Sequence, residues 1–252
     1  MKKADILKQL TTPIGGPAFT RGPFRFYNRE YFNILYRTDY DALRAVVPEP
    51  LEIDEPLVRW EVMRMPDTEG LGDYTECGQA IQVRLGQEKG EYLHAMYLDN
   101  LPALASGREV SAYPKKWGAP RLYVDSDTLV GTLDYGTLRV ATATMGYKHR
   151  RLDPEQARAE LCLPTFMLKL LWTYDSPEPR GEPRIAELLR TQITDITIKG
   201  AWKGPARLQL FEHALAPMAD FPVREIVSAS HILTDLTLAR AKRCHDYLDD
   251  AS

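Results

Sequence analysis

The sequence is poor in the residues that build disulfide frameworks and metal sites. Its 252 residues include only three cysteines and five histidines, and Cys77, Cys162 and Cys244 lie far apart. An odd, scattered set of cysteines fits neither a disulfide scaffold nor a zinc cluster. The histidines form no i, i+4 pair and no HExxH pattern. We therefore expect free thiols in a reducing compartment and no bound metal.

The sequence also lacks a surplus of positive charge and a long apolar run. Its 32 Lys and Arg against 35 Asp and Glu give a formal net charge of −3, which argues against an interface dominated by phosphate contacts. The basic N-terminus opens into no apolar stretch of roughly 7 to 15 residues, as a secretory signal would. The apolar run at 166–172 contains Lys169 and is far shorter than the roughly 20 residues of a membrane span. We expect a cytoplasmic protein that binds neither nucleic acid nor membrane.

Strand-forming patterns dominate what remains. Apolar, aromatic and β-branched residues alternate with polar ones in many short segments separated by Gly and Pro. The predicted strands cover residues 24–37, 57–65, 74–85, 92–98, 128–133, 137–145, 184–199, 206–211 and 228–238. Asp134-Tyr135-Gly136 between two of them is a hairpin signal.

Few helices are expected. Asp39 is predicted to cap a short one after the first strand, and Asp153 and Pro154 begin a second that ends near Pro164. A closing helix is expected at about 239–248, and the segment 176–183, rich in Pro and Gly, predicts a surface loop.

Nothing in the pattern marks a domain boundary or an internal repeat. We predict one domain over residues 1–252. Strands at hairpin-length spacing favour a largely antiparallel sheet system, either a barrel or a closed double sheet, that could enclose a pocket.

The most informative segment contains two adjacent lysines, Lys115 and Lys116, after Tyr113-Pro114 and before Trp117. Taken alone, such a pair faces solvent. The flanking aromatic residues raise the alternative that one lysine is partly desolvated, which would lower its pKa. Because Pro114 favours extended backbone, we expect the two side chains to point to opposite faces.

Together with other segments, the Tyr-Pro-Lys-Lys motif resembles the acetoacetate decarboxylase family, nearly end to end. The segments that carry the resemblance are 21–23, 28–33, 47–56, 113–116, 125–136, 141–148, 204–211 and 228–233. Two positions depart from the family pattern: Cys77 stands where a serine is common, and Trp117 where a smaller aliphatic residue is common. We interpret Cys77 as a packing residue and expect Trp117 to narrow the pocket beside Lys115.

The resemblance implies a fold and an assembly. The fold would be mainly β (α+β), an antiparallel double-sheet, cone-like barrel that encloses the active site, with short peripheral helices. The assembly would be a large homo-oligomer, commonly a dodecamer.

The resemblance further implies decarboxylation of acetoacetate to acetone and carbon dioxide through a Schiff base on Lys115, with Lys116 as its charged neighbour and no metal, pyridoxal phosphate or thiamine. A free lysine has a pKa of ~10.4, so at pH ~6.4 only about one amine in ten thousand is unprotonated. In acetoacetate decarboxylase, such a lysine is known to be activated by desolvation or a neighbouring cation. Our hypothesis is that desolvation of Lys115 contributes more than Lys116 does.

Three further residues match family positions. Arg29 would help to bind the substrate carboxylate, and the acids Glu76 and Glu61 would transfer protons or bias that carboxylate electrostatically. Each has a structural alternative: a salt bridge from Arg29 to Glu30 or to a neighbouring strand, and a solvated or salt-bridged strand position for each acid. Between the two acids, we favour Glu76.

Two other functions stay open on the sequence alone. A related Schiff-base aldolase or dehydratase on the same scaffold would share Lys115. A noncatalytic protein that binds a small acid would use the lysines only for ion pairing, and it would form no imine that reduction could trap.

Overall fold

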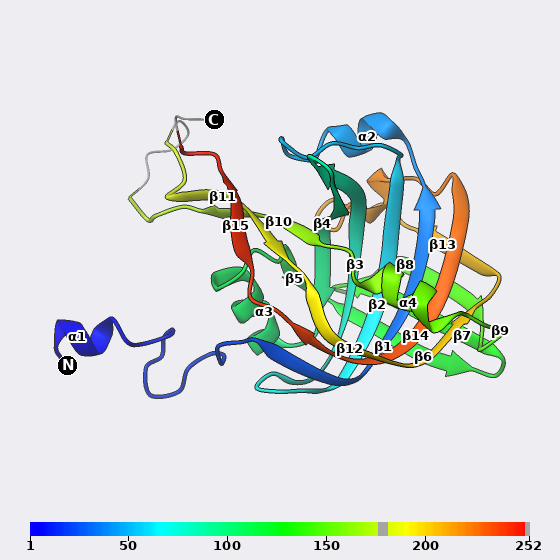
Figure 1. Ribbon diagram of the computed structural model, residues 1–252, viewed down its shortest axis with the longest axis horizontal. Coiled ribbons are helices and arrows are strands. Elements are labelled where there is room, and N and C mark those ends of the chain that lie inside the picture. The colour runs from blue at the N-terminus through cyan, green and yellow to red at the C-terminus, as the bar shows by residue number, and fades with distance from the viewer. Residues whose placement is uncertain (176–180, 250–252) are drawn as a thin grey trace.

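The structure, a computed structural model, describes residues 1–175 and 181–249. It consists of two β-sheets and a few short helices (Figure 1). The predicted mainly-β class and double sheet are confirmed. Most of the loop expected at 176–183 lies outside the described residues. No helix of the described part of the chain is long and apolar enough to cross a membrane.

The large sheet has the strand order β15-β11-β10-β4-β3-β2-β1-β14-β12-β9, and β5 pairs with β4 beside this path. Its strands are β1 (Phe24–Arg37), β2 (Leu57–Thr68), β3 (Gly72–Leu85), β4 (Glu88–Leu98), β5 (Lys115–Trp117), β9 (Arg150–Arg151), β10 (Thr165–Leu171), β11 (Ile185–Thr191), β12 (Ile193–Lys203), β14 (Glu225–Leu238) and β15 (Lys242–Asp246). All its pairs are antiparallel except β4 with β5 and β4 with β10. The path ends at β15 and β9, and within the described residues these two strands do not pair, so the expectation of a closed barrel was wrong.

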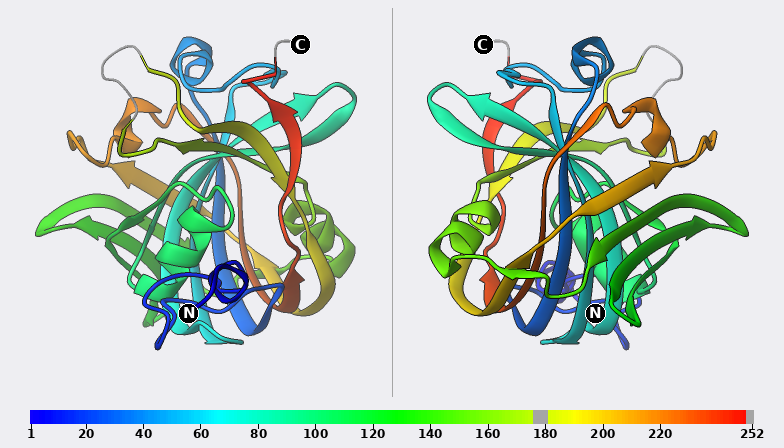
Figure 2. Two further views of the ribbon diagram at one scale, coloured as in Figure 1. Left: turned by 90° about the vertical axis from the view of Figure 1, so that its left-hand side faces the viewer. Right: turned by 90° about the vertical axis from the view of Figure 1, so that its right-hand side faces the viewer.

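The second sheet has four strands in the order β13-β8-β7-β6. They are β6 (Ala119–Asp125), β7 (Thr128–Tyr135), β8 (Leu138–Gly146) and β13 (Ala206–Leu210). The helices are α1 (Lys3–Ile6), α2 (Tyr40–Arg44), α3 (Leu101–Glu109), α4 (Pro154–Leu161) and the 3₁₀ helix η1 (Met218–Asp220). Figure 2 shows the strands of the small sheet lying across those of the large one.

Two hydrophobic cores lie on opposite faces of β1 to β4. Because side chains alternate along a strand, Phe32 and Trp60 pack on one face with the small sheet, whereas Tyr31 and Met63 pack on the other with α3 and α4. Cys77 is fully buried in the first core, as expected of a packing residue. The second face carries the candidate site.

Local signals predicted several elements correctly. The hairpin joins β7 and β8, with Gly136 at φ +63°, a conformation that glycine adopts without strain. The carboxylate of Asp153 accepts hydrogen bonds from the backbone N–H groups of Glu155 (2.9 Å) and Gln156 (3.2 Å), which caps α4 as predicted.

Other predictions were wrong. The closing helix at 239–248 is instead strand β15, because its backbone pairs with β11 and this pairing overrides local helix propensity. The strand expected at 184–199 is two strands, β11 and β12, which join different neighbours. The helix after Asp39 exists and Asp39 stands at its N-cap position, but its carboxylate accepts from Arg224 and not from the first turn of the helix.

Candidate active site

Strand register brings the candidate residues onto one face of the large sheet. Glu61 on β2 lies beside Gly78 of β3, which pairs with Met96 of β4, and Met96 in turn pairs with Lys115 of β5. One row further along, Met63 pairs with Glu76. Residues far apart in sequence therefore meet because each is held in register on an adjacent strand.

Lys115 is buried, with 7% of its surface exposed. Its Nζ donates to the backbone oxygen of Ala103 at 3.3 Å and lies 3.4 Å from Oε1 of Glu76. The ring centres of Tyr113 and Tyr74 lie 5.1 and 5.8 Å away. Burial lowers the pKa of Lys115, Glu76 opposes that effect, and the positive charge of Arg29 adds to it.

Helix α3 forms the wall behind Lys115. Asn100 caps it by accepting from the backbone N–H of Ala103 at 2.8 Å. A Cβ added at Gly107 would lie 2.6 Å from Cδ of Lys115, so a larger residue here would displace the Lys115 side chain. This helix was not predicted, although Asn100 followed by a proline in the first turn is a recognisable start signal.

Lys116 points away from this site. Its ammonium group donates to the backbone oxygen of Leu215 and lies 4.9 Å from the ring centre of Tyr135. The predicted opposite orientation of the two lysines is confirmed. Trp117 is 53% exposed and lines neither cavity at the site, so the expectation that it narrows the pocket was wrong. Among the described residues, strand β5 pairs only with β4.

Arg29 is a buried cation without a carboxylate partner among the described residues. Its guanidinium carbon lies 4.7 Å from the ring centre of Phe26 and 4.7 Å from that of Tyr31, and Nη2 lies 2.8 Å from Sδ of Met63. Its Nε has no hydrogen-bond partner in the part of the chain that the structure describes. Burial disfavours the charge, but nearby groups such as Tyr31 outweigh burial and raise the pKa of Arg29.

The suggested salt bridge from Arg29 to Glu30 was wrong. Adjacent residues of a strand point to opposite faces, and Oε1 of Glu30 instead lies 2.7 Å from Nε2 of His231. Arg29 therefore keeps an unpaired charge and an unpaired donor on the face that carries Lys115.

Glu76 is also buried and incompletely paired. Its Oε1 is 3.4 Å from Lys115 Nζ, but it forms no hydrogen bond of good geometry. Burial raises the pKa of Glu76, while Lys115 and Arg29 lower it. Burial thus pushes both members of the Lys115–Glu76 pair toward their neutral forms.

Glu61 is held differently. Its Oε2 lies 3.4 Å from Nε of Arg59, and the same guanidinium forms an ion pair with Glu91 and donates to the backbone oxygen of Glu160 at 3.3 Å. Burial raises the pKa of Glu91 to about 7, against the opposing effect of Arg59. Arg59 and Glu91 were not predicted as members of the site, because nothing local in the sequence marks two strand residues as partners across a sheet.

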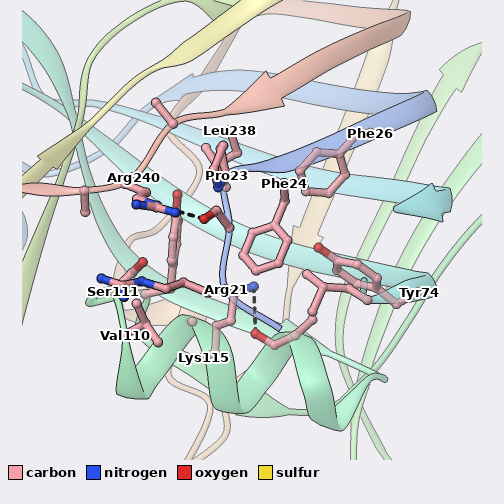
Figure 3. A pocket seen from close by; sticks show the side chains of 17 residues that line it. Arg21, Pro23, Phe24, Phe26, Tyr74, Val110, Ser111, Lys115, Leu238 and Arg240 are labelled. Carbon is pink, nitrogen blue, oxygen red and sulfur yellow. Dashed lines mark hydrogen bonds between the residues drawn. The ribbon is translucent and has the colours of Figure 1, made fainter. Parts of the chain in front are cut away.

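Two adjoining cavities meet at Lys115. The inner chamber, about 70 Å³, is lined by the candidates Arg29, Glu61, Glu76 and Lys115. The outer cavity, about 240 Å³, shares Lys115 with it and is lined largely by apolar and aromatic side chains (Figure 3). Lys116 lines neither of them.

A buried lysine of lowered pKa that lines a small cavity together with an arginine favours a neutral, nucleophilic amine at this position. The carboxyl group beside the lysine adds a group able to move protons. This combination defines the class of site.

Comparison with known proteins narrows that class. The family model described as acetoacetate decarboxylase (ADC) matches residues 10–248. The acetoacetate decarboxylase of Clostridium botulinum (strain Eklund 17B / Type B) is 66% identical, over 98% of this chain and 99% of that protein. The chain belongs to the acetoacetate decarboxylase family.

Solved structures agree with this assignment. One, described as "Structural Studies of Acetoacetate Decarboxylase", is 64% identical with a TM-score of 0.94, covering 99% of this chain and 100% of its own. The crystal structure of acetoacetate decarboxylase from Legionella pneumophila subsp. pneumophila str. Philadelphia 1 is 44% identical with a TM-score of 0.91, covering 99% and 98%.

Proposed function

We propose that this chain decarboxylates acetoacetate to acetone and carbon dioxide through a Schiff base on Lys115. The single observation that carries the mechanism is the burial of this amine beside Ala103, Tyr113 and Tyr74. Burial penalises the ammonium form and so favours the neutral, nucleophilic amine.

The reaction begins when neutral Lys115 Nζ attacks the ketone carbon and water leaves. The protonated imine that results is β to the carboxylate and accepts the electrons of the breaking carbon–carbon bond. Carbon dioxide departs, and the enamine takes up a proton on carbon to form the imine of acetone. Water then hydrolyses this imine, which restores Lys115. The net reaction consumes one proton for each acetoacetate anion.

Arg29 is the group we assign to the substrate carboxylate. Its charge has no acidic partner among the described residues, and its unpaired Nε is a free donor. It lines the inner chamber with Lys115, so a short β-keto acid could place its ketone at Nζ and its carboxylate toward the guanidinium. As the carboxylate turns into neutral carbon dioxide, this attraction is lost and the product leaves.

Glu76 is the group we assign to proton transfer at Lys115. It is the carboxyl nearest to Nζ, and its raised pKa allows it to hold a proton at a higher pH than an exposed glutamate does. We assign Glu61 a positioning role, because its carboxylate is already paired with Arg59. Lys116, on the other side of β5, is assigned no contact with the substrate.

Borohydride reduction with and without acetoacetate tests the proposal. We expect a substrate-dependent adduct on Lys115, found by intact mass and by mapping the peptide that contains residues 113–117, together with loss of activity. Lys116 in the same peptide serves as an internal control and stays unmodified. A folded protein without an adduct, or an adduct on Lys116 alone, would overturn the proposal.

Three other expectations remain proposals: one domain over residues 1–252, a large homo-oligomer, and a cytoplasmic location. The match of the family model to residues 10–248 supports the first. Light scattering coupled to size-exclusion chromatography measures the second, and cell fractionation the third.

A further inference from the structure

The outer cavity has an unusual charge composition. Its lining includes two cations, Arg21 and Arg240, beside the amine of Lys115, and no acidic residue among those that the structure describes. The whole chain, by contrast, carries a net charge of −3. The cavity is therefore a positive site on a protein that is negative overall.

Neither arginine at the mouth is neutralised by the protein. Nε of Arg240 donates to the backbone oxygen of Gly22 at 2.8 Å, which positions the side chain without cancelling its charge. No ion pair of Arg21 or Arg240 is found among the described residues. Seven other arginines do have acidic partners; these are Arg37, Arg84, Arg139, Arg158, Arg190, Arg224 and Arg243.

The fold brings the two arginines together. Phe24 at the start of β1 pairs with Leu238 at the end of β14, so the segment before β1 and the segment after β14 lie side by side. Arg21 belongs to the first segment and Arg240 to the second. Figure 3 shows both side chains on the same side of the cavity as Ser111, away from the ring of Tyr74.

We propose that Arg21 and Arg240 form an anion-capture site at the mouth of the outer cavity. The site attracts the carboxylate of a β-keto acid before that group moves inward to Arg29. A cavity with charges of one sign and apolar walls concentrates ligands of the opposite sign and speeds their association. Acetone is neutral, so the same charges do not retain the product. The inference rests on the proposed function and extends it to substrate entry.

The main experiment compares two double variants of the full-length protein. Arg21→Gln/Arg240→Gln removes the charges at the mouth. Arg121→Gln/Arg207→Gln removes the same net charge from exposed positions on the small sheet, outside both cavities. At low ionic strength we expect the first to lower kcat/KM for acetoacetate about tenfold with kcat unchanged, and the second to change neither.

Ionic strength gives an independent readout. Salt screens exposed charges, so in ~0.5 M salt we expect the mouth variant and the wild type to converge. Equal kcat/KM of the mouth variant and the wild type at low salt, or a deficit that does not shrink with salt, would overturn the capture site.

A neutral substrate separates charge from damage to the site. Exchange of the methyl hydrogens of acetone for deuterium runs the enamine step in reverse at Lys115 and needs no carboxylate. We expect the mouth variant to exchange acetone at the wild-type rate. A parallel loss of exchange would mean that the substitutions disturb Lys115 and would overturn capture as the explanation.

The affinity for 3-hydroxybutyrate tests the capture site independently of decarboxylation. This probe has the carboxylate but no ketone, so its binding requires no imine. We expect its Kd at low salt to rise about tenfold in the mouth variant and to stay unchanged in the control. If the wild type does not decarboxylate acetoacetate but the Kd still rises in the mouth variant alone, the proposed function is rejected and the capture site stands. If the Kd does not change in the mouth variant, the capture site is rejected.

Discussion

Two clusters of buried charge lie on the same face of the large sheet and differ in how completely they are paired. In one, Arg59 contacts Glu61 and Glu91 and also donates to a backbone oxygen. In the other, Lys115 and Glu76 touch at 3.4 Å, and Arg29 has no acidic partner among the described residues. Burial alone does not distinguish them, because all the side chains of both are largely buried.

The difference separates structural charges from available ones. In a fully paired buried ion pair, the charges and hydrogen-bonding groups already have partners in the protein and are not available to a ligand. Removing one member leaves the other as an uncompensated buried charge. A buried group without a full set of partners keeps its capacity for a substrate that brings the missing charge or proton. We therefore expect the first cluster to control stability and the second to control catalysis.

The largest expected effect is at Lys115. Lys115→Ala removes the nucleophile, so we expect kcat/KM to fall by at least ~10⁴-fold, which corresponds to about 5.5 kcal/mol. Steady-state release of carbon dioxide measures this, and circular dichroism checks that the variant folds. Retention of more than about one per cent of the activity would contradict the role of Lys115.

The next effect concerns stability. Arg59→Gln leaves Glu61 and Glu91 buried without their cation, and we expect a loss of about 3–5 kcal/mol in the free energy of unfolding at pH 8. Arg59 lowers the pKa of Glu91, so its removal raises that pKa further above 7. A carboxyl whose pKa is higher in the folded protein than in the unfolded chain stabilises the fold at a pH below its unfolded pKa of about 4.5. This stabilisation is lost as the pH rises through its pKa in the folded protein.

The deficit of Arg59→Gln should therefore be smaller at pH 5 than at pH 8. Urea unfolding at the two pH values measures it, and the exposed Arg121→Gln is the control. A deficit that is the same at both pH values would contradict our account of the paired cluster.

Arg29 gives the third effect. Arg29→Gln keeps the size of the side chain but removes the charge that we assign to the substrate carboxylate, and we expect kcat/KM to fall about 10²-fold, or about 2.7 kcal/mol. Because Arg29→Gln leaves no buried acidic partner without its cation, we expect the free energy of unfolding to change much less than in Arg59→Gln. A large loss of stability with normal kcat/KM would reverse the roles assigned to the two arginines.

Glu76 provides a smaller effect with a defined sign. Its negative charge raises the pKa of Lys115, so Glu76→Gln should lower that pKa further. Activity requires the neutral amine and rises as the pH passes the pKa of Lys115, so the acidic limb of kcat/KM should move to lower pH. The pH profile measures the shift, with Glu61→Gln as the matched control from the paired cluster. A shift to higher pH would exclude the proposed interaction.

The smallest effect is expected at Lys116. Its side chain points to the other face of β5, and burial is the largest cause of the lowered pKa of Lys115. We expect Lys116→Met to leave the acidic limb of kcat/KM in place and kcat within about twofold. Acylation of Lys115 as a function of pH tests the same point directly. A strong rise in the Lys115 pKa would show that the neighbouring charge dominates and that desolvation does not.

Sequence reasoning succeeded where the signal is local. The caps of α4, the hairpin around Gly136 and the opposite orientation of Lys115 and Lys116 each follow from a few consecutive residues. It failed where a distant segment decides the outcome. The residues of β15 favour a helix locally, but β11 offers an unpaired strand edge, and pairing with it satisfies the backbone of both.

The sequence by itself determined the family, the lysine motif, and which residues of each strand share a face, because alternation along a strand is a local property. Only the tertiary structure decided that Glu61 has Arg59 as its partner while Glu76 faces Lys115, that α3 closes the space behind Lys115, and that Arg21 and Arg240 line the same cavity. Those outcomes depend on the register of neighbouring strands and on the juxtaposition of distant segments. The free energy of burial and pairing, summed over the whole fold, fixes both.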